Sequence, residues 1–124
     1  MTKLILIRHG QTVWNKLGKY QGQADVELSD AGKLQAELLG TNFPFGELDA
    51  VYSSNLKRAV ETAGRVAEKF NTEPIPCQEF REINFGEWEG LTYDEIHASW
   101  PKEHDMLFKS PDKLICPAGE GFVD

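Results

Sequence analysis

Cysteine, positive charge and long apolar runs are all scarce in this sequence, and each shortage excludes a class of protein. The two cysteines, Cys77 and Cys116, stand in no CxxC or Cys/His spacing of the kind that binds zinc. We therefore expect two free thiols in a reducing cytosol. Acidic residues outnumber basic ones, and the net charge of −7 argues against a general binder of nucleic acid or of anionic membranes.

The N-terminal apolar run covers only residues 4–7 and is followed directly by Arg8. It is too short for the hydrophobic region of a signal peptide or for a membrane span, so we expect a cytoplasmic protein. No internal repeat, low-complexity tract or linker divides the 124 residues, which are enough for one domain with one modest core.

The same N-terminal run predicts a strand that ends at a ligand site. Four apolar residues without alternation are typical of a strand covered on both faces in an α/β fold. Arg8, His9 and Gly10 follow at its carboxyl end, where open α/β sheets bind ligands. Arginine suits phosphate, histidine can act as nucleophile or base, and Gly10 would let the backbone approach a ligand. On the tripeptide alone, a polar turn after a strand is an equal alternative.

Periodicity and capping residues predict the other elements. A helix is predicted to begin at Ser29, which is a good N-cap, and Gly40 and Pro44 mark its end. Its expected buried stripe consists of Ala31, Leu34, Leu38 and Leu39. The further elements are a strand at 49–53, a helix over 56–70 capped by Ser53 or Ser54, a strand at 74–77, a helix at 91–100 that Pro101 ends or follows with another, an irregular stretch at 106–116 and a turn at 117–121.

Arg58 lies in the first turn of the second long helix, off its apolar stripe. Side chains on a helix lean towards its N-terminus, so Arg58 and Arg8 would face one phosphate from two strand-to-helix corners. The alternative, which spacing alone favours, is that Arg58, Thr62 and Arg65 form an ordinary solvated face.

Residues 80–90 mix aromatics, glycines and carboxylates without periodicity, which is typical of a packed loop beside a site. One of Glu82, Glu87 and Glu89 could be a general acid, and spacing does not choose among them. The amide of Asn15 could return to the His9 pocket through one or two helical turns, or it could lie on the surface. His97 and His104 are expected to be surface or partly buried histidines rather than catalytic ones.

Three segments together resemble the histidine phosphatase superfamily, which includes the cofactor-dependent phosphoglycerate mutases. They are residues 8–12 with Asn15, residues 52–59 with Thr62, and residues 81–90, in the order of the family. The match runs from Lys3 to about Tyr93. The third segment resembles the small phosphatase branch, particularly the α-ribazole phosphatases of cobalamin synthesis, more than the mutases.

The resemblance implies a three-layer α/β/α sandwich with a mixed, mostly parallel sheet, and a phosphomonoester hydrolase that works through phosphohistidine. It implies no metal and no other cofactor. His9 resembles the nucleophile and Glu82 the proton donor to the leaving oxygen. The other implied site residues are Arg8, Arg58 and Asn15 for phosphate, and Gln21 and Gly22 at the substrate entrance. The expected partner is a small phosphorylated metabolite, and the alternatives are a bisphosphoglycerate-dependent mutase or an inactive phosphate-binding fragment.

Two features of the family pattern are missing. The family has a second catalytic histidine in a His-Gly motif after an inner strand, and neither His97 nor His104 stands in such a motif. Gly121 replaces the serine of the family turn. We therefore expect residues 1–124 to be the N-terminal portion of a single histidine phosphatase domain. Without the second histidine as a charged donor, we expect its rate of phosphoryl transfer to be lower by about two to three powers of ten. An open edge on residues 4–7 would favour dimerisation.

Overall fold

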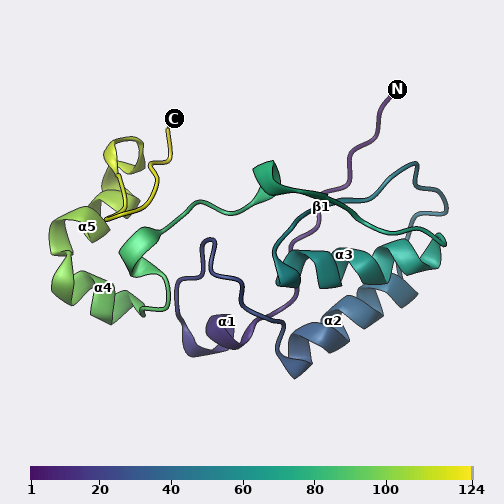
Figure 1. Ribbon diagram of the computed structural model, residues 1–124, viewed down its shortest axis with the longest axis horizontal. Coiled ribbons are helices and arrows are strands. Elements are labelled where there is room, and N and C mark those ends of the chain that lie inside the picture. Colours follow the sequence, from purple (N-terminus) through teal and green to yellow (C-terminus); the bar gives the residue numbers. More distant parts are fainter. Residues whose placement is uncertain (124) are drawn as a thin grey trace.

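The computed structural model describes residues 1–123 as two groups of helices joined by loops (Figure 1). α2 and α3 lie together at one end of the molecule with the short sheet, and α4 and α5 lie at the other. The elements are α1 Val13–Leu17, α2 Asp30–Thr41, β1 Tyr52–Ser54, α3 Lys57–Lys69, β2 Ile75–Cys77, α4 Tyr93–Ser99 and α5 Pro101–Lys109, with single 3-10 turns at Gln78–Phe80, Gly86–Trp88 and Pro111–Lys113.

β1 and β2 form a parallel pair connected through α3. Tyr52 pairs with Ile75 and Ser54 with Cys77. The strands predicted at 49–53 and 74–77 are confirmed, although β1 begins three residues later than predicted. Because the two strands are parallel, their carboxyl ends meet at one edge, from which α3 starts.

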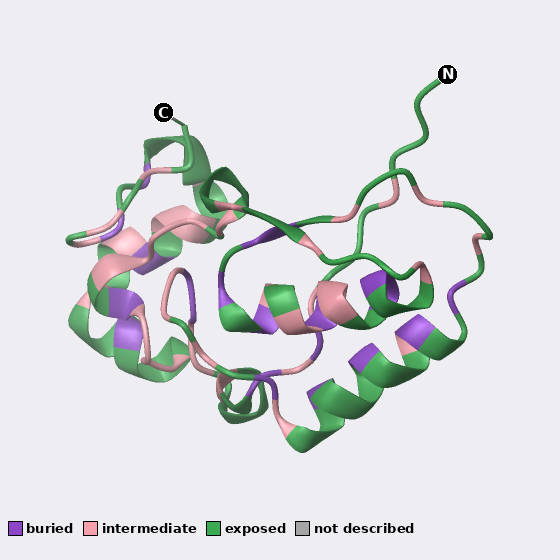
Figure 2. Ribbon diagram, turned by 45° about the vertical axis from the view of Figure 1, so that its right-hand side comes forward, coloured by how far each residue is buried: buried purple, intermediate pink, exposed green. Residues whose placement is uncertain are grey.

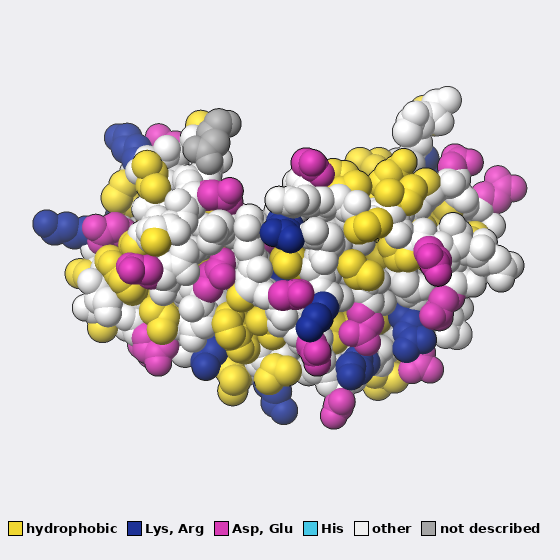
Figure 3. All heavy atoms as spheres, in the orientation of Figure 1, with side chains coloured by type: hydrophobic (Ala, Val, Ile, Leu, Met, Phe, Trp, Pro, Cys, Tyr) yellow, Lys and Arg dark blue, Asp and Glu magenta, His cyan; other side chains and the backbone are white. Residues whose placement is uncertain are grey.

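The N-terminal segment departs from the prediction of a covered strand. Residues 4–7 are in no strand, and Leu4 and Leu6 remain 78% and 85% exposed. The segment and β1 line the same cavity of about 1020 Å³, so the segment lies across that space from β1 rather than hydrogen-bonded to it. The prediction is therefore wrong for the described residues. Figure 3 shows hydrophobic side chains gathered on this part of the surface.

α2 packs on α3 through small residues. Ser29 caps it as predicted, because its hydroxyl accepts a hydrogen bond from the N–H of Gly32 at 3.1 Å. The predicted leucine stripe is wrong, since Leu34 and Leu38 are 54% and 51% exposed. The buried face consists of Gly32, Ala36 and Gly40 at i, i+4 and i+8 (Figure 2). A side chain at Gly40 would overlap the backbone of Arg65 on α3, so glycine here permits the close helix contact.

α3 begins without a side-chain cap of its own. Leu56 occupies the N-cap position, so the prediction of Ser53 or Ser54 as cap is wrong; both serines belong to β1 and its end. The carboxylate of Asp25 accepts the N–H of Lys57 at 2.7 Å and satisfies one free helix donor from a distant loop. Leu56 is buried, as the apolar stripe predicts.

The second group of helices encloses its own apolar cluster. Its buried residues are Trp88, Ile96, Leu114 and Cys116. Thr92 and Glu95 form a capping box at the start of α4, and α5 starts at Pro101. The predicted irregular stretch from 106 is wrong as far as Lys109, because α5 continues to that residue. Residues 117–121 form a turn, as predicted.

His104 is fully buried in this group, which corrects the prediction of a surface or partly buried residue. Its Nε2 atom lies 3.2 Å from the Tyr20 hydroxyl, and its Nδ1 atom lies 3.4 Å from Nδ1 of His97. Both cysteines are free thiols, as predicted. None of the helices in residues 1–123 is long and apolar enough to cross a membrane.

Candidate active site

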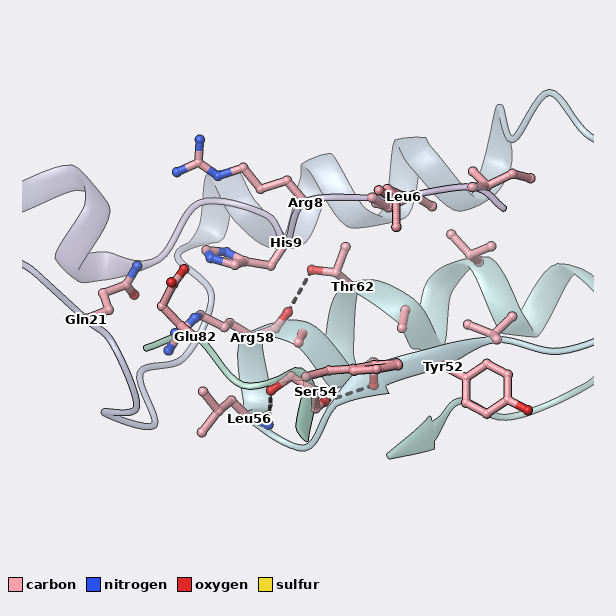
Figure 4. A pocket seen from close by; sticks show the side chains of 18 of the residues that line it. Leu6, Arg8, His9, Gln21, Tyr52, Ser54, Leu56, Arg58, Thr62 and Glu82 are labelled. Atoms are coloured by element: carbon pink, nitrogen blue, oxygen red, sulfur yellow. Dashed lines mark hydrogen bonds between the residues drawn. The ribbon is translucent and has the colours of Figure 1, made fainter. Parts of the chain in front are cut away.

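One cavity collects all the site residues that the family resemblance implies. Its wall comes from the N-terminal segment, α1, the loop after α1, β1, the first turns of α3 and the segment before Phe85. The predicted residues on this wall are Arg8, His9, Asn15, Gln21, Gly22, Arg58 and Glu82. Figure 4 labels five of them: Arg8, His9, Gln21, Arg58 and Glu82. The structure thus brings these residues together, and their roles stay predictions.

The ring of His9 is held in one orientation and one tautomer. Its Nδ1 atom lies 2.6 Å from the carbonyl oxygen of Gly10. A carbonyl only accepts, so Nδ1 carries the ring proton and Nε2 keeps its lone pair. Burial lowers the pKa of His9 below its ordinary value near 6.5, and the charges of Arg58 and Arg8 lower it further; the Gly10 carbonyl and Glu82 oppose them. The result is a neutral imidazole with a free nitrogen.

Thr62 fixes the backbone beside His9, a role that sequence reasoning missed. The N–H of Gly10 donates to the Thr62 hydroxyl at 3.0 Å, and that hydroxyl donates to the carbonyl of Arg58 at 2.8 Å. Gly10 itself packs against α2, where a Cβ would lie 2.6 Å from the carbonyl oxygen of Gly32. Its small size therefore serves helix packing, and the predicted approach of its backbone to a ligand stays a prediction. The sequence feature that could have revealed this role is the position of Thr62, which lies one helical turn after Arg58.

Arg58 is a fixed, buried cation in the cavity wall. It is only 3% exposed, and its two Nη atoms donate to the carbonyls of Ala24 at 2.7 Å and Gly22 at 2.5 Å. Burial lowers the pKa of Arg58, while the charges of Glu82, Asp25 and Glu89 raise it. Arginine stays charged under such conditions. The solvated-face alternative is therefore wrong for Arg58.

The same alternative is wrong for Thr62, which is buried, and it holds for Arg65 alone. Arg65 is exposed and pairs with Glu68 of the same helix at 3.4 Å. The two arginines of α3 therefore differ in exposure: Arg58 is buried in the cavity wall, and Arg65 is solvated.

The structure separates the three candidate carboxylates. Glu82 lines the cavity, and Figure 4 shows its carboxylate directed towards the ring of His9. Its charge acts on both His9 and Arg58. Glu87 is exposed, and Glu89 turns its carboxylate to the backbone N–H groups of Gln23 and Phe85. Glu82 is thus the candidate acid.

Asn15 and Gln21 are positioned through Thr12. The Asn15 side-chain oxygen accepts the N–H of Thr12, and the Thr12 hydroxyl accepts the N–H of Asn15, both at 3.0 Å. The same hydroxyl donates to the side-chain oxygen of Gln21. One turn of α1 therefore brings Asn15 to the cavity, which decides between the two positions that the spacing left open. Both amide oxygens are occupied, which leaves the amide nitrogens as the groups to offer a ligand.

The site gathers positive charge in an acidic chain. Arg8 is exposed at the rim, and Arg58 is buried in the wall. Within residues 1–123, no group of three or more His, Cys, Asp or Glu side chains is placed to hold a metal ion. What the arrangement offers chemically is a neutral histidine between cations and a carboxylate, which suits attack on an anionic oxyacid ester.

A comparison with known families decides the assignment. The model of the histidine phosphatase superfamily (branch 1) matches residues 4–124. The chain belongs to the histidine phosphatase superfamily. Phosphoserine phosphatase 1 of Hydrogenobacter thermophilus is 40% identical over 123 residues, which are 99% of this chain and 58% of the relative. A 2,3-bisphosphoglycerate-dependent phosphoglycerate mutase 2 of Bacteroides thetaiotaomicron is 33% identical over 114 residues, 88% of this chain and 46% of the relative.

The fold agrees with that of solved family members. An Escherichia coli protein provisionally assigned as an α-ribazole-5′-phosphate phosphatase superposes with a TM-score of 0.85 at 31% identity, over 94% of this chain and 57% of the neighbour. This likeness confirms the predicted α/β fold, of which the described residues contain two hydrogen-bonded strands. The chain spans about half the length of the curated relatives it matches.

Proposed function

We propose that this site hydrolyses phosphomonoesters through a phosphohistidine at His9. The observation that carries the proposal is the hydrogen bond from Nδ1 of His9 to the carbonyl of Gly10, which leaves Nε2 free in a cavity lined by Arg8, Arg58 and Glu82. Phosphatase names among the relatives support the same class of reaction.

In the first step, Nε2 of His9 forms a bond to phosphorus and the ester P–O bond breaks. Glu82 gives its proton to the departing oxygen, because an alkoxide is a poor leaving group. Arg8 and Arg58 neutralise the non-bridging oxygens, which is most of what a protein contributes to phosphoryl transfer. The nitrogen of the Asn15 amide donates to one of these oxygens.

In the second step, water attacks phosphorus and the P–N bond breaks. The carboxylate of Glu82 takes a proton from this water, so that inorganic phosphate leaves and Glu82 is again protonated for the next cycle. The electron pair of the broken bond returns to Nε2 of His9. No net proton and no redox partner are needed.

The substrate is a small phosphorylated metabolite in this proposal. α-Ribazole 5′-phosphate and phosphoserine are the two compounds to test first, since one solved neighbour and one curated relative carry those names. The cytoplasmic location and a homodimer stay predictions, as does the absence of nucleic-acid and membrane partners.

Leaving-group chemistry tests the role of Glu82. Glu82→Gln is expected to slow the first step, which releases the alcohol of an alkyl monoester, by about 10²–10⁴-fold. It should have little effect on the first step with p-nitrophenyl phosphate, whose leaving group needs no proton. Because Glu82 also serves the second step, which both esters share, the comparison is the release of alcohol or p-nitrophenol in a single turnover, and Glu87→Gln, which alters an exposed carboxylate, is the control. An equal loss on both esters would exclude Glu82 as the acid.

A phosphoglycerate mutase is the second candidate, favoured by the relative of that name. A mutase keeps its phosphoryl group until monophosphoglycerate accepts it. Transfer of labelled phosphate from the enzyme to monophosphoglycerate, faster than to water, would replace the hydrolase proposal with this one.

A further inference from the structure

Glu89 joins two distant parts of the chain through one oxygen atom. Its Oε1 accepts the N–H of Gln23 at 2.8 Å and the N–H of Phe85 at 3.2 Å. Hydrogen bonds from N–H groups to an ionised carboxylate are stronger than those between neutral groups. The carboxylate therefore ties the loop 22–24 to the segment that carries Glu82.

The loop 22–24 in turn determines where Arg58 points. Gly22 and Ala24, the neighbours of Gln23 on either side, supply the two carbonyls that accept the Nη donors of Arg58. A guanidinium is a planar fork, so two fixed acceptors fix its orientation. The amide that Glu89 holds lies between these two acceptors.

The absence of a side chain at residue 22 makes room for this arrangement. Gly22 has a φ of +52°, and a Cβ there would overlap Oε1 of Glu89 and lie 2.8 Å from the carbonyl oxygen of Ile83. The backbone bonds of Tyr20 with Gly90 and Leu91 hold the chain before the loop, not the loop itself. The loop itself is held by the carboxylate of Glu89, together with the hydrogen bond that Nε2 of Gln23 donates to the carbonyl of Glu82 at 3.2 Å.

We propose that Glu89 is a positioning residue for phosphate binding: its carboxylate anchors the loop 22–24 and thereby aims the guanidinium of Arg58 into the cavity. The same contact with the N–H of Phe85 fixes the segment of Glu82 relative to Arg58. The consequence for phosphate affinity rests on the proposed function, whereas the ordering of Arg58 does not.

The test measures the order of Arg58 and phosphate affinity separately, on the 124-residue chain. The side-chain N–H signals of Arg58, assigned by their loss in Arg58→Lys, are recorded by ¹⁵N NMR, and the Kd of inorganic phosphate is measured by calorimetry. Glu89→Ala is expected to broaden the Arg58 signals and to raise the Kd about tenfold, the effect of losing one good hydrogen bond. Glu89→Gln keeps an acceptor oxygen and should restore most of both, and Glu87→Ala should change neither.

Gly22→Ala supplies a second perturbation in case Glu89→Ala does not fold, because its Cβ displaces the same oxygen. It is expected to broaden the Arg58 signals as well. Sharp Arg58 signals and an unchanged Kd in folded Glu89→Ala would overturn the proposal, as would Glu89→Gln behaving like Glu89→Ala. If the unaltered chain bound no phosphate, the proposed function would fail, while the NMR signals would still decide the role of Glu89.

Discussion

The protonation of His9 depends on contacts that act in opposite directions. The Gly10 carbonyl holds a proton on Nδ1, whereas burial and the two arginines disfavour a second proton on Nε2. The pKa of His9 is therefore lowered, so the ring remains a neutral nucleophile at pH values where a free histidine is partly charged. The activity of such a site should persist below pH 6.5 and decline only as the pH falls through the lowered pKa.

Arg58→Gln tests this balance. Removing the cation removes one cause of the lowered pKa, so the pKa of His9 should rise and the acid limb of the pH–rate profile should move to higher pH. Titration of the His9 ring by ¹⁵N NMR gives the pKa directly. Arg65→Gln removes an exposed arginine from the same helix and serves as the control. An unchanged His9 titration in Arg58→Gln would contradict the electrostatic account.

His104 predicts a pH dependence of stability away from the site. Burial lowers its pKa below 6.5, His97 lowers it further, and Asp105 opposes; the neutral Tyr20 hydroxyl lies on the other ring nitrogen. Between the lowered pKa and 6.5 the unfolded chain binds more protons than the folded one, so the free energy of unfolding decreases as the pH falls through this window. The contribution of His104 to the free energy of unfolding is fully present above pH 6.5.

Urea unfolding at pH 7.5 and pH 5.5 measures this loss. His104→Leu removes the titrating ring and should reduce the difference between the two pH values, while His9 still contributes a part of it. A difference as large in His104→Leu as in the unaltered chain would show that His104 is not responsible.

At the scale of elements, the predicted cap is right for α2 and wrong for α3, and the apolar pattern is right for Leu56 of α3 and wrong for α2. Ser29 caps α2 as predicted, and Thr92 caps α4, because a cap depends on residues three positions apart. The buried face of α2 depends instead on how closely α3 approaches. The small residue Gly40 permits that approach, and nothing in the spacing of the leucines reveals it.

Two glycine substitutions test the packing of α2 on α3. Gly40→Ala would place a methyl group 2.9 Å from the carbonyl carbon of Arg65, so it should destabilise the chain by about 1–3 kcal/mol through overpacking. Gly64→Ala, in the interior of α3 with open space around it, should instead stabilise by about 1 kcal/mol through helix propensity. Urea unfolding gives both values, and equal effects of one sign would contradict the assigned contact.

For the whole molecule, the motifs predict the site better than the fold around it. Residues 8, 9, 15, 58 and 82 reach one cavity, and each lies in a short motif that the sequence displays. Thr62 and Glu89 act through contacts across 52 and 66 positions, which no local pattern encodes. The same reason explains why the strand prediction for residues 4–7 is wrong. Their apolar run favours a strand, but a strand also needs a distant partner, which no local pattern encodes.

A phosphoenzyme trap tests the central claim most directly. The 124-residue chain is incubated with a labelled phosphomonoester and quenched in base, which preserves phosphohistidine, and the labelled residue is identified. We predict acid-labile label on His9, with none in His9→Asn and little in Arg58→Gln. A folded chain without label, or label that persists in His9→Asn, would contradict the assignment of His9 as the nucleophile.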